Sequence, residues 1–372
     1  MTPEELRADV PALANGDTAY LNYGAHGPSP SYVVDASSSF LADHEYGSAD
    51  ADPYDVAFDA YETVRSRIAD FLGADPEAVA LTQSTTDGIN RIAGAIEWDS
   101  GDVVVRTDLE HPAGVLPWQR LEREGVEVRV LETTDGRIDR EAFAEAVEDA
   151  TLACFSAITW THGTRLPVAD LVEIASAAGA FTLVDAVQVP GQRAMDVTEW
   201  GADAVAAAGH KWLLGPWGAG FLYVDPDSAS DLAPHSVGYR SVETPSATGV
   251  EYHPGARRFE IGSASPAPHV GLLEAIDAIE SIGLPTIEAR IERLTDRLKN
   301  RIDDDRLVSP REYESGLVTI ADDDPEATVE RLADREIAVR SLPWPEAVRV
   351  SVHAVSTADE IDAVADALGD TA

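Results

Sequence analysis

The chain has 372 residues, of which 44% are apolar, so it can bury a large core, and its length fits two domains better than one. Asp and Glu number 67 against 27 Lys and Arg, which leaves a formal net charge of −40 spread along the chain. Such a surface repels nucleic-acid phosphates and anionic lipids, which disfavours nucleic-acid and membrane partners and favours a folded protein from a salt-loving organism.

A mostly parallel sheet covered by helices is predicted from about residue 60 onward, because extended and helical patterns alternate there. The expected strands are Ala78–Thr82, Val103–Thr107, Val126–Leu131, Thr151–Ile158, Phe181–Asp185, Ala204–Ala207 and Gly220–Val224. The helices expected between them are Pro112–Glu124, Glu141–Glu148 and Val168–Ala178.

The following segment, Asp225–Ala256, is rich in Pro, Ser and Gly and is predicted to be a long surface or active-site loop. A helix is expected next, at Val270–Ser281. A smaller α+β unit is expected after it, with strands at Leu317–Ile320 and Arg349–Val352 and helices at Arg290–Ile302, Thr328–Arg335 and Thr357–Leu368. We therefore expect an N-terminal arm (1–15), a large α/β domain (16–275) and a small C-terminal domain (276–372).

Neither the start of the chain nor its apolar runs indicate export. Residues 1–5 lack a basic region followed by an apolar core, and no apolar run approaches membrane-spanning length, so we expect a cytoplasmic protein. The single cysteine, Cys154, excludes an intrachain disulfide and a multi-cysteine metal site, and we predict no metal. It lies in a strand-like run, where a small buried residue is expected.

Lysine occurs only twice, at Lys211 and Lys299, beside 25 arginines. Lys299 lies in the Arg-rich amphipathic stretch Arg290–Ile302, where Arg would serve equally well, so it is expected to be a solvated helix residue. Lys211, by contrast, follows an apolar strand and the pair Gly209-His210. Asp185 ends another apolar strand, at the edge where open α/β sheets build their sites, although an isolated Asp there commonly caps a helix.

Lys211 and Asp185 together fit the two needs of a pyridoxal 5'-phosphate (PLP) enzyme, an amine for the cofactor's carbonyl and a carboxylate for its ring nitrogen. The hydroxyl-rich turn Thr82–Gly88 precedes a helix and offers phosphate donors, with an ordinary capped helix as the alternative. His111 follows another strand, where its imidazole would stack on the ring unless it is purely structural.

Taken in this order, the motifs resemble the class V aminotransferase family of PLP fold type I, which contains cysteine desulfurases, selenocysteine lyases and cysteine/cystine C–S lyases. The resemblance runs from about Tyr20 to the C-terminus. Its segments are Tyr20–Ala25, Thr85–Asn90, Glu110–Ala113, Asp185–Gln188 and Gly209–Lys211, the last two being the most specific.

The resemblance implies the cofactor-binding set Thr85, Thr86, His111, Asp185, Gln188, His210, Lys211 and Ser263. In this set Lys211 would form the Schiff base, Asp185 would pair with the ring nitrogen, and His111 would cover the ring. Gln188 would bond the phenolic oxygen, and the two threonines with His210 would hold the phosphate. The expected catalytic residues are Lys211, Asp185 and His111.

The resemblance also implies a homodimer, because Arg258–Ser263 resembles the segment through which Ser263 would reach the neighbouring subunit's phosphate. Arg349 matches the arginine that binds the substrate carboxylate, a task that suits a guanidinium, with an exposed edge-strand arginine as the alternative. Arg340 and Asn22 complete the expected substrate-binding residues.

Three departures from the family pattern restrict the reaction. Between Arg340 and Arg349 the chain has no cysteine, and Cys154 is expected to be buried, so persulfide-forming desulfuration, which needs a mobile thiolate, is disfavoured. The segment Thr159–Gly163 contains Trp in place of the desulfurases' asparagine and is closer to the C–S lyases. Ala208 replaces a usual phosphate-binding serine, which would weaken cofactor binding.

We therefore expect β-elimination from a small cysteine-like amino acid, with Lys211 removing the α-proton to give pyruvate and ammonia. Transamination to a 2-oxo acid uses the same residues and is the main alternative. Cysteine desulfuration, epimerisation and a non-catalytic PLP-fold protein rank lower. Retention of Lys211 in a chain with only two lysines argues against the last of these.

Overall fold

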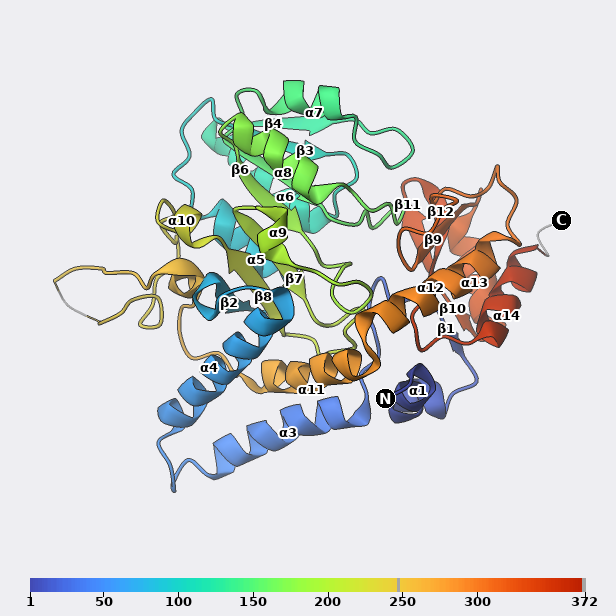
Figure 1. The fold of residues 1–372 in the computed structure, drawn as a ribbon, viewed down its shortest axis with the longest axis horizontal. Coiled ribbons are helices and arrows are strands. Elements are labelled where there is room, and N and C mark those ends of the chain that lie inside the picture. Colours follow the sequence, from blue (N-terminus) through green and yellow to red (C-terminus); the bar gives the residue numbers. More distant parts are fainter. Residues whose placement is uncertain (246–247, 370–372) are drawn as a thin grey trace.

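A seven-stranded sheet forms the centre of the molecule (Figure 1). The computed structural model describes residues 1–245 and 248–369. The strands follow the spatial order β2-β8-β7-β6-β5-β3-β4, and all neighbours are parallel except β8, which is antiparallel to both β2 and β7. Their bounds are β2 Val79–Thr82, β3 Val103–Thr107, β4 Glu127–Leu131, β5 Leu152–Ser156, β6 Phe181–Asp185, β7 Ala204–Ala208 and β8 Gly220–Val224. The predicted mostly parallel sheet is confirmed.

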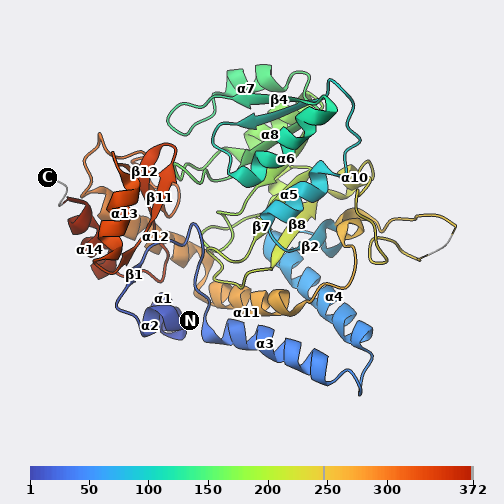
Figure 2. The ribbon, with the colours of Figure 1, turned by 180° about the vertical axis from the view of Figure 1, so that it is seen from behind.

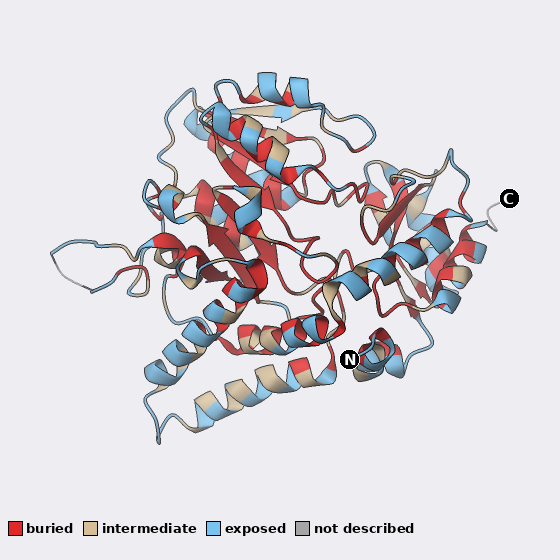
Figure 3. Cartoon of the chain, viewed as in Figure 1, coloured by how far each residue is buried: buried red, intermediate tan, exposed pale blue. Residues whose placement is uncertain are grey.

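Helices cover both faces of the sheet, so its strands other than the edge strand β4 are largely buried, and successive side chains of a strand enter opposite faces. In β5, for example, Ala153 and Phe155 enter one hydrophobic cluster, and Leu152 and Cys154 enter the other. The first cluster lies against α4 Pro53–Leu72, α7 Arg140–Val147, α8 Val168–Ala177 and α11 Ala267–Ile282. The second lies against α5 Thr85–Ala93 and α6 Leu116–Leu121. Figure 3 shows this buried centre inside a largely exposed shell of helix faces.

Two long N-terminal helices were not predicted from the sequence. They are α3 Ser31–Tyr46 and α4 Pro53–Leu72, and α3 runs beside α11 in both views (Figures 1 and 2). Only Val33 of α3 is fully buried, so this helix carries little apolar periodicity to recognise. The expected helix Pro112–Glu124 is divided into η2 Pro112–Gly114, α6 and η3 Glu122–Glu124.

A second, three-stranded antiparallel sheet has the order β11-β12-β9. Its strands are β9 Leu317–Ala321, β11 Arg340–Pro343 and β12 Glu346–Ser351, and its helices are α12 Leu284–Lys299, α13 Pro325–Ala333 and α14 Ala358–Gly369. The N-terminal strand β1 Ala19–Tyr20 pairs with β10 Ile337–Ala338. Ala19 and Ile337 pack into a third hydrophobic cluster, which the small sheet forms with α12, α13 and α14. The three-part division of the chain stays a prediction, and its boundary at residue 275 lies inside α11.

Short elements and one loop complete the chain. The remaining helices are α1 Pro3–Asp9, α2 Pro11–Ala14, η1 Pro76–Ala78, α9 Val197–Trp200, α10 Pro226–Ala229 and η4 Gly255–Phe259. Beyond α10, the segment predicted as a long loop is indeed irregular where it is described, and it projects from the body in Figure 1. Within the described ranges, no helix is both long and apolar enough to cross a membrane.

Lys299 corrects a sequence-based prediction, because its side chain is buried and not solvated. The residue is 2% exposed at the end of α12, and its Nζ donates to the carbonyl oxygens of Pro310 (2.7 Å) and Glu312 (3.0 Å). The Arg-rich pattern describes the outer face of the helix, whereas Lys299 lies beneath the segment that follows it. A compact ammonium group satisfies two carbonyls in a space that the chain folds over only in the tertiary structure.

Candidate active site

A cavity of about 330 Å³ lies at the carboxyl edge of the large sheet and is also lined by Arg340 and Arg349 of the small sheet. Its lining is formed by Gly24, Ala25, Ser84, Thr85, Thr86, His111, Ala113, Trp160, Asp185, Val187, Gln188, His210, Lys211, Trp217, Arg340 and Arg349. Most of the residues singled out from the sequence therefore meet in one place, although they are spread over more than 250 positions of the chain. The two that do not line it are Asn22 and Ser263.

Strand direction explains this convergence. Asp185 is the last residue of β6, and Lys211 and His111 follow the ends of the parallel strands β7 and β3. Because β2 and β7 are both antiparallel to β8, β2 points the same way as β7 and delivers Thr85 to the same edge. Open α/β sheets place their ligands at this edge.

Lys211 and Asp185 are electrostatically coupled. Burial lowers the pKa of Lys211 to about 7, with Arg349 and Arg340 lowering it further and Asp185 opposing the shift. Burial raises the pKa of Asp185, opposed by the Val187 N–H, which donates to its Oδ1 at 2.9 Å, and by Lys211. A lysine with this pKa is partly unprotonated near neutrality, so it can act as a nucleophile and as a base.

The turn before α5 is built to receive an anion. Ser84 caps the helix, its Oγ accepting from the Asp87 N–H at 3.1 Å. Thr85 is 5% exposed and lines the cavity, and its Oγ1 is among the buried atoms of the described residues that have no hydrogen-bond partner. His210 lies in the same cavity, and burial lowers its pKa to about 4. A hydroxyl without a partner at a helix N-terminus suits a phosphate.

His111 faces the cavity as a neutral imidazole. Its Nδ1 accepts from the Ala113 N–H at 3.2 Å, so the ring proton is on Nε2. Burial lowers its pKa to about 4, and the cations Lys211, Arg340 and Arg349 lower it further. The ring stands perpendicular to that of Trp160, with centroids 5.3 Å apart.

Gln188 is held from two sides. Its Nε2 donates to the Gly24 carbonyl at 3.0 Å, and its Oε1 accepts from Trp212 Nε1 at 2.7 Å. The side chain is 2% exposed. Since an amide nitrogen carries two hydrogens, one N–H of Gln188 remains for a ligand in the cavity.

Arg349 is not the exposed edge-strand residue that the sequence left open as an alternative. It lies on β12, the central strand of the small sheet, is 1% exposed, and donates from Nη1 to the Trp160 carbonyl at 2.9 Å. Arg340 on β11 is directly opposite, and both line the cavity. Burial and then Arg340 lower the pKa of Arg349 to about 9.

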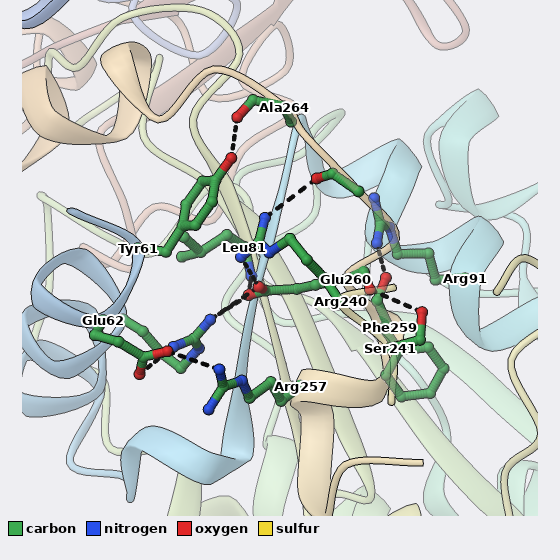
Figure 4. A network of polar contacts seen from close by, with 12 residues as sticks. Tyr61, Glu62, Leu81, Arg91, Arg240, Ser241, Arg257, Phe259, Glu260 and Ala264 are labelled. Carbon is green, nitrogen blue, oxygen red and sulfur yellow. Dashed lines mark hydrogen bonds and ion pairs between the residues drawn. The ribbon is translucent and has the colours of Figure 1, made fainter. Parts of the chain in front are cut away.

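Asn22 and Ser263 lie outside this lining. Asn22 forms an isolated parallel β-bridge with Ser351 through the backbone. The buried Oδ1 of its side chain has no hydrogen-bond partner in the described structure. Ser263 is exposed. Its segment is anchored by Glu260, shown in Figure 4: the buried carboxylate accepts from the Leu81 N–H at 2.9 Å and pairs with Arg240, and Arg65 donates to both its oxygens at 2.8 and 2.9 Å.

Cys154 is buried in β5 and 1% exposed, as expected, and burial keeps its pKa well above the usual value. It does not line the cavity, and β11 and β12 form a tight hairpin in which Pro343 pairs with Glu346 and there is no thiol. The sequence reasoning missed Trp217, which lines the cavity six residues after Lys211. The only sequence feature that could have indicated Trp217 is a large aromatic residue, near glycines, that lies close to the Gly209–Lys211 motif.

Comparisons with known proteins agree with this geometry. The family model "Aminotransferase class-V" matches residues 19–364. A Halobacterium salinarum protein named "Probable cysteine desulfurase" is 32% identical over 393 residues, covering 97% of this chain and 94% of that protein. The apo structure of a cysteine desulfurase from Thermococcus onnurineus NA1 has a TM-score of 0.89 and 27% identity, covering 99% of this chain and 97% of that one.

The fold also matches the structure of the cystine C-S lyase C-DES in complex with its reaction product cysteine persulfide. The TM-score is 0.90 at 24% identity, covering 97% of this chain and 99% of that one. The matched strands carry the residues that form the cavity, and the family model spans nearly the whole chain. This chain belongs to the class V aminotransferase family, and it is a PLP-dependent enzyme.

Proposed function

We propose that the enzyme catalyses β-elimination from a small cysteine-like amino acid such as L-cystine. The observation that carries this proposal is a cavity that combines Lys211, Asp185 and Arg349 and has no thiol in its lining. With L-cystine, one C–S bond breaks and one water is consumed, giving cysteine persulfide, pyruvate and ammonia, with no net oxidation or reduction.

The residues present fit PLP. Thr85 Oγ1 without a partner, the N-terminus of α5 and His210 would hold the phosphate, and the free N–H of Gln188 would bind the phenolic oxygen. Asp185 would hold the ring nitrogen, and His111 would cover the ring. The bound cofactor supplies an electron sink for the carbanion that forms when the α-proton leaves.

Lys211 would attach the cofactor through its Nζ and then remove the α-proton. A pKa of about 7 supports both tasks, because a useful fraction of the amine is neutral at the working pH. Asp185 raises the pKa of Lys211 and so opposes complete deprotonation of the amine. The amine can therefore take up the α-proton and release it again. Neutral His111 presents Nε2–H and adds no cation to a site that already holds two arginines.

Arg349 would bind the substrate carboxylate. Like charges directly opposite each other on antiparallel strands are destabilising, and an anion between Arg340 and Arg349 offsets their repulsion. Burial strengthens a guanidinium–carboxylate pair, which supports Arg349 as the principal contact and Arg340, on the exposed side, as the secondary one. Asn22 is proposed as a neighbour of this end because it bridges to Ser351 beyond Arg349.

The lack of a thiol favours elimination over persulfide transfer to the protein, despite the names of the relatives. Transamination would use the same cofactor residues, and no contact in the cavity favours it. Ser263 supports a homodimer with shared sites because it is exposed on an anchored segment, away from its own cavity. A cytoplasmic location stays a prediction.

The test is pyruvate release from L-cystine and L-cysteine in concentrated KCl without any 2-oxo acid. Steady release is expected from the wild type and from Cys154→Ala, and none from Lys211→Ala. If the enzyme with bound PLP released no pyruvate but, with an added 2-oxo acid, converted the substrate into its own 2-oxo acid and the acceptor into an amino acid, it would be a transaminase. Loss of activity in a folded Cys154→Ala protein would mean that sulfur passes through the protein thiol.

A further inference from the structure

Trp212, the residue directly after Lys211, is fully buried and held by three groups from other parts of the chain. Its Nε1 donates to Gln188 Oε1 at 2.7 Å, and its carbonyl oxygen lies 3.0 Å from His353 Nε2. Its ring lies against Gly316, where an added Cβ would come within 2.6 Å of ring atoms. The backbone that carries Lys211 is therefore restrained on its C-terminal side.

The neighbours of His353 determine its tautomer. Its Nδ1 accepts from the Val355 N–H at 3.2 Å, so the proton must be on Nε2, and Nε2 donates to the Trp212 carbonyl. The ring stacks on Tyr23, with centroids 4.9 Å apart, and on Trp212, with centroids 6.0 Å apart. His353 is 0% exposed, and burial lowers its pKa to about 4, which keeps this neutral form at neutral pH.

His353 also follows closely on the strand that presents Arg349. It lies four residues beyond Arg349, just after β12, where the Val352 N–H donates to the Gly316 carbonyl at 2.7 Å. The same stretch therefore carries the proposed substrate-carboxylate arginine and the group that holds the residue after Lys211. Through Trp212, this contact also reaches Gln188.

We propose that His353 is a positioning residue for Lys211. It donates to the Trp212 carbonyl and so holds the lysine in register with Arg349 across the junction of the two sheets. The proposal rests on the proposed role of Lys211 as the cofactor-binding lysine. It adds that the position of this lysine depends on a contact from the small sheet and not only on its own strand.

Two substitutions separate this role from simple packing. His353→Phe keeps an aromatic ring between Tyr23 and Trp212 but removes the donor. His353→Gln keeps a donor that can reach the Trp212 carbonyl but removes the ring. If His353 only fills space, the Phe variant should resemble the wild type and the Gln variant should be impaired; a positioning role predicts the reverse order.

The experiment compares wild type, both variants and Lys211→Ala in concentrated KCl. The readouts are the melting temperature of the apoprotein, the Kd for PLP from visible absorption, and the pH midpoint of the bound cofactor's absorption without substrate. His353→Phe should bind PLP about 3- to 10-fold more weakly, the effect of one lost hydrogen bond, and shift the midpoint. His353→Gln should lie closer to the wild type in both, even if it melts lower.

A His353→Phe protein with the wild-type Kd and midpoint, or a Gln variant at least as impaired in both, would overturn the proposal. If the Phe variant does not fold, His353→Leu replaces it, because it also removes the donor and its side chain is smaller than that of Phe; an unchanged midpoint there is equally negative. Lys211→Ala tests the underlying assignment separately. A wild-type absorption profile from that variant would remove the proposed role of Lys211 itself.

Discussion

At the scale of single residues, burial lowers the pKa values of the cationic groups in the site, and only Lys211 comes close to a change of charge near neutral pH. Lys211 has a pKa of about 7 and Arg349 one of about 9, and burial is the first cause of both shifts. Two arginines and a lysine share one cavity with the carboxylate of Asp185. This excess of positive charge suits the cofactor phosphate and an amino-acid carboxylate, in a protein that is otherwise strongly acidic.

Arg349→Lys should lower kcat/KM for L-cystine by about 10- to 100-fold, because an ammonium group cannot make the two parallel hydrogen bonds that a guanidinium makes to a carboxylate. Arg340→Lys, on the exposed side of the same strand pair, is the matched control and should cost less. Steady-state kinetics in concentrated KCl measure both. Equal effects would show that Arg349 is not the principal carboxylate contact.

Lys299→Arg should destabilise the fold by about 1–3 kcal/mol, because a larger planar group must enter the space of an ammonium held by two carbonyls. Arg301→Lys, the reverse exchange two residues further on and partly exposed, should change stability by less than about 0.5 kcal/mol. Urea unfolding at fixed KCl compares them. A Lys299→Arg protein as stable as wild type would mean that Arg does serve equally well there.

At the scale of elements, Glu260 connects three pieces that the chain separates widely. Its carboxylate joins α4 through Arg65, β2 through the Leu81 N–H, and the exposed loop through Arg240. Burial raises the pKa of Glu260, but Arg65 and Arg240 outweigh it, so the pKa lies below its usual value. The segment after Glu260 includes Ser263, and β2 leads into the phosphate turn.

Glu260→Gln should destabilise the protein by about 3–5 kcal/mol, since it removes the buried counter-charge of Arg65 and leaves this arginine only its pair with the exposed Glu62. Glu280→Gln, which removes one exposed partner of Arg67, is the control and should cost no more than about 1 kcal/mol. Unfolding at fixed KCl gives both values, and limited proteolysis should show earlier cleavage of the loop before Glu260. Similar losses in the two variants would contradict this anchoring role.

At the scale of the whole molecule, the net charge of −40 means that self-repulsion opposes the compact state, and dissolved salt weakens that repulsion. Apart from Glu110, Asp185, Glu260 and Glu360, the acidic residues that the structure describes are not buried, whereas His111 and His210 are half-buried and His353 is buried. Stability therefore depends on pH through groups that the surface charge does not reveal.

Stability should rise as pH increases from about 4.5 to 6.5. His111, His210 and His353 each have a folded pKa of about 4, below the unfolded value of 6.5, so their contribution is fully present above 6.5 and is lost as pH falls toward 4. Buried Glu110, with its pKa raised to about 7, acts in the opposite direction between 4.5 and 7. Asp185, whose pKa burial also raises, acts in the same direction as Glu110. Three histidines outweigh these two carboxyl groups.

Melting temperatures of the apoprotein across this pH range, at constant KCl, measure the slope. His353→Gln should flatten it, because the variant lacks one of the three groups. A melting temperature that is flat or falls with increasing pH would show that these imidazoles are not buried in their neutral form.

The sequence by itself determined the large sheet and the identity of the key side chains. Strands such as Phe181–Asp185 are continuous apolar runs, and a strand end is a local feature, so Asp185 and the Lys211 motif could be recognised without any partner. The rarity of lysine pointed to Lys211 in the same way. The absence of cysteine between Arg340 and Arg349 is likewise readable from the printed chain.

Only the tertiary structure decided which side chains are enclosed by distant segments. Lys299 and His353 have the sequence pattern of ordinary polar residues until residues far along the chain cover them. The resemblance singled out Arg349, but its burial likewise comes only from the tertiary structure. The same holds for α3, whose packing partner α11 is more than 200 residues away. The burial of a side chain and its pKa depend on long-range contacts, and local periodicity does not reveal these contacts.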